Sequence, residues 1–258
     1  MNKSHRPYII YYGNLFLLLS TLLSGSVYSN TAVPTIKLAP FEIDYDISRS
    51  GITIVHMKRQ LLKINDNEYR FESRSRPSKA VSWILKDRIS EHSHWKYHQQ
   101  QPRPLHYHYQ RRDSRKKKHI ELDFDWQKGI VSDNKRAPFW SSRIPPQTLD
   151  KLLYQLQLML DLQSGKAELS YTIADSGKIR HYDFVRTGTE TIQLPLGRYE
   201  TVKLHRNSGE RSSTIWFAPE LNYLPVRIEH QAKDGSIMQA NATRVKGLPF
   251  HINNESQP

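Results

Sequence analysis

Apolar and polar residues alternate along most of the chain from Phe41 onward. In FEIDYDIS, the apolar side chains of Phe41, Ile43, Tyr45 and Ile47 alternate with acidic or small polar residues. A period of two is typical of a strand with one buried face. Further segments follow it: ITIVH from Ile52, EYRFES from Glu68, HIELDFDW to Trp126, ELSYTIA to Ala174, HYDFV to Val185, and residues 201–204, 213–217, 225–230 and 237–243. Turn-forming residues separate many of these segments, which together predict about a dozen strands.

The segment QTLDKLLYQLQLMLDLQSG, which follows two prolines, departs from this alternation. Its apolar residues recur three and four positions apart between Leu149 and Leu160. This spacing predicts an amphipathic helix over about residues 148–164, with Thr148 as N-cap, Asp150 in the first turn and Gly165 near the C-cap. A shorter helical turn is expected over residues 78–85.

A large antiparallel sheet must protect its edges and bury its apolar face. A curled sheet with a helix over its open mouth or concave face does both. We therefore predict a mainly β protein, a curled antiparallel sheet or incomplete β-barrel with one long amphipathic helix packed on it. A β-sandwich is the alternative. The expected organisation is one β-rich domain over residues 41–247, with a lead-in over 30–40 and a flexible tail over 248–258.

The first residues have the order of a secretory signal peptide. Lys3 and Arg6 precede an apolar core between Leu15 and Leu23, and small residues follow it. The apolar run is shorter than the roughly 18 residues of a membrane span, so we expect cleavage of residues 1–29, with an uncleaved anchor as the alternative. No transmembrane anchor is expected after cleavage. The sequence has no cysteine, which excludes a lipidated cysteine, disulfides and thiolate chemistry. A bacterial periplasm is the simplest compartment.

The chain is strongly basic, and its charge is concentrated in one run. It has 38 Lys and Arg against 25 Asp and Glu, a formal charge of +13. Such an excess favours anionic partners. Alternating segments on both sides place the run RRDSRKKK at the tip of a hairpin in solvent. The run contains no aromatic residue for base stacking, so nucleic acid is disfavoured. The first interpretation of the run is therefore an ordinary solvated hairpin, and contact with an anionic lipid or glycan is the alternative. The candidate binding residues for that contact are Arg111, Arg112, Arg115, Lys116, Lys117 and Lys118.

Histidines recur as pairs with one residue between them, His92 with His94 and His106 with His108. Such a pair shares one face of a strand and would chelate zinc if a third ligand approached. Glu121, Asp123 and Asp125 offer carboxylates on one face of the following segment. The same positions form the ordinary polar face of an amphipathic strand, so no metal ligand is assigned. Motifs for a serine nucleophile, a phosphate loop or a dinucleotide are absent, and we assign no catalytic residue and no cofactor.

The most distinctive segment is TIWFAPELNYLPVRIEH, which begins at Thr214. It predicts a strand that ends at Phe217, a turn, and a second strand entered through a proline. Trp216 and Phe217 face opposite sides, so only one can be buried unless both faces are covered. The string resembles the uncharacterised exported bacterial family known as domain of unknown function 3108. The matching positions are Trp216, Phe217, Pro219, Leu224, Pro225, Val226 and Arg227, within a similarity that extends over about residues 41–246.

The resemblance implies a periplasmic, β-rich domain without assigned catalytic residues, and it implies a structural role for this hairpin. A broader architectural similarity exists to the half-barrel of periplasmic lipoprotein carriers, whose curved sheet holds acyl chains under a helical lid. We therefore expect a non-enzymatic envelope protein that binds an amphiphile or an anionic glycan. A hydrolase of a cell-wall or surface polymer and a structural partner in an envelope assembly are the alternatives.

Overall fold

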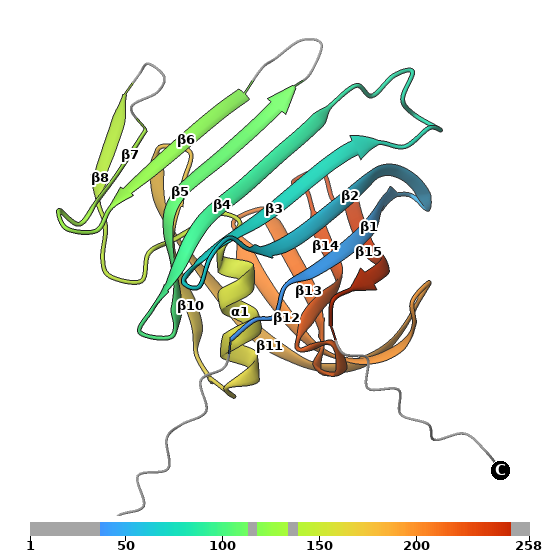
Figure 1. The fold of residues 1–258 in the computed structure, drawn as a ribbon. Coiled ribbons are helices and arrows are strands. Elements are labelled where there is room, and N and C mark those ends of the chain that lie inside the picture. Colours follow the sequence, from blue (N-terminus) through green and yellow to red (C-terminus); the bar gives the residue numbers. More distant parts are fainter. Residues whose placement is uncertain (1–36, 113–117, 134–138, 249–258) are drawn as a thin grey trace, which may run out of the picture. The chain divides into compact units, whose positions relative to one another are not determined.

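The first and last strands of the domain pair with each other and join two runs of strands into one sheet (Figure 1). The computed structural model describes residues 37–112, 118–133 and 139–248, all within one compact unit. The fifteen strands lie in the order β8, β7, β6, β5, β4, β3, β2, β1, β15, β14, β13, β12, β11, β10, β9.

The N-terminal half of the described chain supplies nine strands. They are β1 (Phe41–Arg49), β2 (Ile52–Lys63), β3 (Glu68–Pro77), β4 (Arg88–His98), β5 (Gln101–Arg112), β6 (Lys118–Asp125), β7 (Ile130–Asp133), β8 (Trp140–Arg143) and β9 (Leu149–Asp150). After helix α1 (Tyr154–Gln163) come β10 (Leu169–Asp175), β11 (Lys178–Leu194), β12 (Gly197–Ser208), β13 (Arg211–Ala218), the 3-10 turn η1 (Pro219–Leu221), β14 (Leu224–Gln231) and β15 (Ile237–Lys246).

The predicted mainly β fold with one helix is confirmed, and two details differ. Fifteen strands form instead of about a dozen, because short strands such as β9, with two residues, are too brief to show a period of two. All described strands belong to one sheet, so the sandwich alternative is wrong. The pairing is antiparallel except between β9 and β10, which run parallel. The sheet is open, since β8 and β9 form its two edges.

A change of partner along β11 helps this sheet to curl. The first part of β11 pairs with β10, and the part from Val185 to Leu194 pairs with β12. The register shifts between Arg186 and Gly188, where Gly188 adopts a φ of +119°, a conformation that favours glycine. Irregularities of this kind bend a strand and increase its twist. Figure 1 shows the result, in which α1 lies between the β1–β6 part and the β11–β14 part of the sheet.

Helix α1 is enclosed and short, which corrects two predictions. It begins at Tyr154 and has ten residues, whereas the spacing predicted a helix from about residue 148. It is also buried on every side rather than amphipathic, because its polar side chains point into the protein as well. Gln155 accepts a hydrogen bond from Arg59 at 2.5 Å, and Asp161 accepts one from Tyr171 at 2.7 Å. The predicted turn over residues 78–85 forms hydrogen-bonded turns but no helix.

The two ends of α1 differ in how well the sequence predicted them. Gly165 follows the C-cap with a φ of +72°, and Lys166 N–H bonds to Asp161 C=O at 2.9 Å, as expected for a left-handed helix end. Thr148 is not the N-cap, because residues 149–150 extend into β9 and pair with β10. Asp150 instead caps the chain just before the helix, and its Oδ1 accepts from the Leu152 and Leu153 N–H groups.

Several predicted features lie outside the described residues. These are the signal peptide over residues 1–29 and most of the tail, while Leu248 at its start is buried. No helix in the described ranges is long and apolar enough to cross a membrane.

Asp150 is fully buried, and burial first, with the charge of Glu91 adding to it, raises its pKa to about 6. Its Oδ2 also accepts from Ser93 Oγ at 2.5 Å. We expect Asp150→Ala to lower the free energy of unfolding by about 2–4 kcal/mol, because it leaves buried donors without acceptors. Asp150→Asn keeps an acceptor for the backbone N–H groups and is expected within about 1 kcal/mol of wild type at pH 8.

Urea unfolding of the same variants at several pH values tests the protonation of Asp150. A carboxyl with a raised folded-state pKa stabilises the fold at low pH, and that contribution is lost as pH rises through about 6. Asp150→Asn should therefore gain stability relative to wild type between pH 4 and pH 7. Equal losses for the Ala and Asn variants would contradict this assignment.

Candidate functional site

The candidate site lies on the outer face of β1–β6, the side of these strands that points away from α1. Alternation assigns the faces: Phe41, Ile43 and Tyr45 are buried inside, while Glu42 and Asp44 point outward. Cross-strand pairing then builds continuous rows of outer side chains. One row crosses the sheet in the order Arg244, Asp44, Lys58, Arg74, Ser90, Gln110 and His119. A neighbouring row contains Glu42, Gln60, Glu72, His92, His108 and Glu121.

A cationic groove of about 920 Å³ is hollowed into this face. Its charged lining comes from strands β15 and β1–β5, with six cations against two carboxylates. The cations are Lys58, Arg74, Arg76, Arg88, Arg112 and Arg244, and the carboxylates are Asp44 and Asp46. This volume falls within the range of about 300–1,000 Å³ that is typical of ligand pockets. The groove is therefore large enough and charged enough to receive an anionic group.

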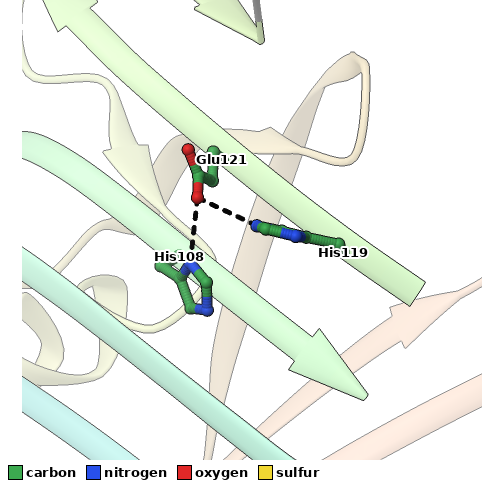
Figure 2. Close-up of side chains that lie close together, drawn as sticks. All are labelled: His108, His119 and Glu121. Atoms are coloured by element: carbon green, nitrogen blue, oxygen red, sulfur yellow. Dashed lines mark hydrogen bonds and ion pairs between the residues drawn. The ribbon is translucent and has the colours of Figure 1, made fainter. Parts of the chain in front are cut away.

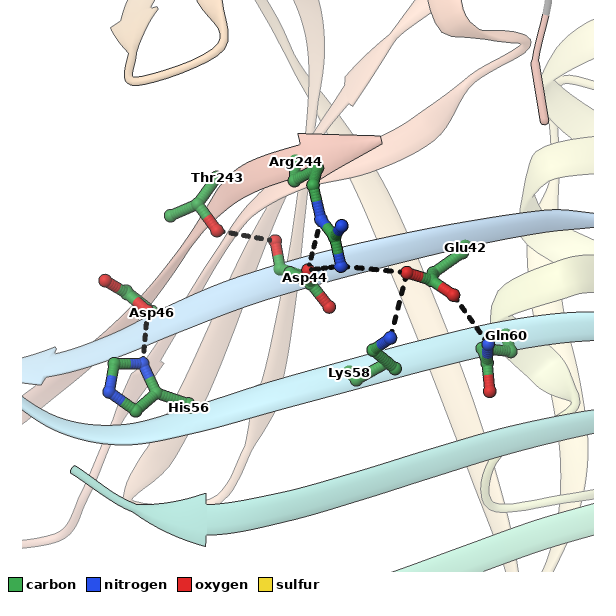
Figure 3. A network of polar contacts seen from close by, with 8 residues as sticks. All are labelled: Glu42, Asp44, Asp46, His56, Lys58, Gln60, Thr243 and Arg244. Carbon is green, nitrogen blue, oxygen red and sulfur yellow. Dashed lines mark hydrogen bonds and ion pairs between the residues drawn. The ribbon is translucent and has the colours of Figure 1, made fainter. Parts of the chain in front are cut away.

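The cations at the two ends of the groove differ in their partners. At the β15 end, Arg244 pairs with Asp44 at 2.6 Å and with Glu42 at 3.0 Å, and Lys58 donates to Glu42 at 2.9 Å (Figure 3). The hydrogen bond from Lys58 and the adjacent cations lower the pKa of Glu42. These acidic side chains are saturated by protein cations, so this end is neutralised internally.

At the other end, three arginines have no such partner. Arg88 on β4 lies directly opposite Arg112 on β5. Arg76 lies on the same outer face of β3, the strand on the other side of β4. Arg76, Arg88 and Arg112 form no ion pair or hydrogen bond with a carboxylate in the described part of the chain. Like charges opposite each other destabilise a sheet. We name these three residues the arginine triad, and it is the part of the groove that an external anion would neutralise.

Histidines and carboxylates gather beside the groove on β4–β6. His106 bonds to Asp123 at 2.8 Å, and Glu121 lies 3.0 Å from His119 Nε2 and 3.5 Å from His108 Nδ1 (Figure 2). His92 stacks on His108 with ring centroids 4.9 Å apart. Of the described residues, His108, His119 and Glu121 form the group whose ligand atoms lie within 4.8 Å of one another, close enough to hold a metal ion.

These contacts shift the pKa values of several groups in this cluster. Burial first, then Arg70 and the neighbouring histidines, lowers the pKa of His92 to about 4. Burial, together with His119, also lowers the pKa of His108. Burial alone would raise the pKa of Glu121, but the hydrogen bond from His119 and the nearby imidazoles bring it below its ordinary value. His92 is therefore neutral at neutral pH.

The predicted basic hairpin forms between β5 and β6, where Arg111 pairs with Lys118. Arg112 lines the groove, whereas Arg111 forms an ion pair with Asp87 and Lys118 lies 5.8 Å from the Tyr109 ring centre. Arg115, Lys116 and Lys117 lie outside the described residues. The described part of this run thus contributes one side chain to the groove.

The Trp216 hairpin lies away from the groove, and both of its aromatic side chains are buried. Phe217 packs in the core, while Trp216 is 4% exposed on the other face. The Lys203 and Arg227 side chains cover Trp216, and its Nε1 donates to Glu190 at 2.9 Å. Of the remaining hairpin residues, Pro219 opens η1, Leu224 begins β14, and Pro225 C=O accepts from Tyr45 OH at 2.5 Å.

The hollows on the α1 side of the sheet are small. One of about 10 Å³ lies between Phe41, Arg59 and Met159, which is room for about one water. Another of about 150 Å³ lies near Pro102, Pro145 and Tyr171. The helix and its neighbours fill the concave side with protein side chains.

Sequence reasoning missed most of the groove, because its six cations come from five separate strands. Arg76 and Arg88 stand in segments with no unusual local charge. His119 was also missed as a neighbour of His108. Its position could have been predicted by pairing residue 111 with residue 118 across the hairpin. That register sets His108 opposite Glu121, and His119 lies two residues before Glu121 on the same face of the strand.

These features define a mainly β protein with one open, curled sheet around a buried helix and a cationic outer groove. A comparison with protein families matches residues 40–241 to the protein of unknown function family DUF3108, and the chain belongs to this family. No curated protein matches the sequence. Among solved structures, the fold is similar to a beta-barrel-like protein of domain of unknown function DUF1849 from Brucella abortus. The TM-score is 0.55 at 9% identity, over 81% of this chain and 98% of that one.

Repulsion within the arginine triad should lower the free energy of unfolding. We expect Arg88→Gln to raise the free energy of unfolding by about 0.2–1 kcal/mol at low salt, because it removes a like charge between two others. The difference should shrink at high salt, where surface charges are screened. Arg244→Gln is the matched control, because this arginine has two carboxylate partners and its loss should destabilise. Urea unfolding of both variants at two salt concentrations measures the effect, and a destabilised Arg88→Gln would argue against unrelieved repulsion.

Proposed function

We propose that this protein is a non-enzymatic binding protein of the bacterial envelope, which holds the anionic headgroup of an amphiphile in its outer groove. The leader sequence supports the periplasm as the compartment. The observation that carries the proposal is the arginine triad, three adjacent cations without a described carboxylate partner in a hollow of about 920 Å³. The ligand group is a phosphate or a carboxylate, since guanidinium groups bind both through paired hydrogen bonds.

An exposed apolar loop at the triad end of the groove favours an amphiphile over a purely polar ligand. The loop joins β3 to β4, so Arg76 and Arg88 flank it in the sequence. At its tip, Trp83 is 76% exposed and Ile84 is 67% exposed. Exposed Trp together with nearby Lys and Arg is typical of surfaces that rest on the headgroup region of a bilayer. The loop and the triad together match a molecule or surface with an anionic head and an apolar part.

The concave side offers less support for acyl-chain binding of the carrier type. Helix α1 is enclosed there, and the hollows beside it measure about 10 and 150 Å³. A ligand chain would have to displace the buried leucines of α1. The proposal therefore places the headgroup in the outer groove, with the apolar contact at the Trp83 loop.

The proposal is tested by combining Arg76→Gln, Arg88→Gln and Arg112→Gln. Binding is measured by co-sedimentation with vesicles of phosphatidylglycerol, with phosphatidylcholine vesicles as the neutral comparison. A cation near an anionic surface contributes about 1 kcal/mol, so the triple variant should bind phosphatidylglycerol about ten- to a hundred-fold more weakly. Binding of the wild type should also fall steeply with added salt.

The matched control removes the same charge elsewhere, through Lys128→Gln, Arg198→Gln and Lys246→Gln, which lie outside the groove lining. If the control triple weakens binding as much as the groove triple, net charge and not the groove is responsible. Absence of any wild-type binding to phosphatidylglycerol vesicles at low salt would overturn the proposal.

A variant of the apolar loop separates an amphiphile from a soluble glycan. We expect Trp83→Ser to weaken binding to phosphatidylglycerol vesicles several-fold, because an exposed indole loses its place at the interface. Binding to alginate, a soluble carboxylated polysaccharide, should be unchanged by this substitution. Alginate binding as tight as vesicle binding, with no effect of Trp83→Ser on either, would instead identify an anionic glycan as the ligand.

A further inference from the structure

We propose that His108, His119 and Glu121 form a binding site for a divalent transition-metal ion, with zinc as the best match. The three side chains share the outer face of β5 and β6, where the hairpin register sets His108 opposite Glu121 and alternation sets His119 beside it. Two imidazoles and one carboxylate are ligands that zinc accepts, and the absence of cysteine excludes thiolate ligands.

The distances between the ligand atoms already approach those of a zinc site. Zinc binds nitrogen and oxygen at about 2.0–2.2 Å, which sets tetrahedral ligands about 3.3 Å apart. Glu121 Oε1 lies 3.0 Å from His119 Nε2 and 3.5 Å from His108 Nδ1. The remaining separation, between the two imidazole nitrogens, is at most 4.8 Å, so it needs to change by no more than about 1.5 Å to reach the tetrahedral value. Side-chain rotation can supply this change, because all three residues are partly exposed.

The surroundings favour a defined site over a loose cluster. Both strands belong to the hydrogen-bonded sheet, so the three Cα atoms are held in register. The His92 ring stacks against His108 from the β4 side and limits the movement of that imidazole. In Figure 2, one carboxylate oxygen of Glu121 contacts both imidazole rings, through a hydrogen bond with His119 and an ion pair with His108, and an ion would bind among these three side chains.

Three protein ligands leave at least one coordination position open for water or an anion. His119 pairs with Gln110, which lines the cationic groove, so the ion would lie next to the groove. A bound divalent ion would add positive charge there and could coordinate an oxygen of the same anionic headgroup. The metal site itself is independent of that ligand, and it is tested without any vesicle or glycan.

The test is calorimetric titration of the tag-free full chain with zinc chloride. Wild type should bind one ion per chain, and His108→Ala, His119→Ala and Glu121→Gln should each weaken binding at least about ten-fold, because each removes a ligand. His205→Ala is the matched control, since this histidine lies on β12 and bonds to Thr214 and Asn207. The control should bind within about two-fold of wild type.

A spectroscopic measurement supports the titration and reports on coordination. Cobalt(II) added to wild type and to His205→Ala should give visible absorption bands of a four- or five-coordinate ion, which Glu121→Gln and His119→Ala should lack. Circular dichroism confirms that the variants are folded. The proposal is overturned if wild type binds no stoichiometric zinc, or if the ligand variants and the control bind it equally well.

Discussion

Enclosure of α1 is the constraint on which the rest of this structure depends. The helix has buried residues at every position from Gln155 to Leu162, so no side of it can face water. One flat sheet face covers only one side of a helix. The sheet therefore has to curl, and it does so through the change of partner along β11 and the register shifts in several other pairs. Two buried polar side chains of the helix bond to strands of the curled sheet, since Gln155 accepts from Arg59 on β2 and Asp161 accepts from Tyr171 on β10.

This arrangement decides which surface is available for function. With the concave side filled by α1 and its leucines, the unfilled space lies on the outer face, where twist and curl hollow a groove across β15 and β1–β5. Outer side chains of neighbouring strands stand in rows there, so charges that are distant in the sequence become adjacent. At one end of the groove Arg244 is paired with carboxylates, and at the other the arginine triad is not. The two ends of the groove therefore differ in charge, and the triad end is the more cationic.

The similarity to a beta-barrel-like protein at 9% identity supports the fold and carries no function, because folds of this kind serve many roles. The Trp216 hairpin, the most distinctive segment of the sequence, lies in the core and against a covered outer patch. Its side chains stabilise the joint between β12, β13 and β14. The distinctive string therefore describes how the sheet is built, whereas the groove lies on other strands.

Strand identity followed from local patterning, because each long strand such as β1 or β6 has one buried and one solvated face, and that alternation is visible in a single segment. The C-terminal end of α1 at Gly165 was likewise predictable from the local sequence, because a glycine there readily adopts the positive φ that ends a helix. The start of α1 was not, because residues 149–150 pair with β10, which follows them in the chain. The arginine triad and the His108, His119 and Glu121 cluster also depend on which strands become neighbours. Register between strands is set by long-range pairing and packing, and no local pattern in the chain contains it.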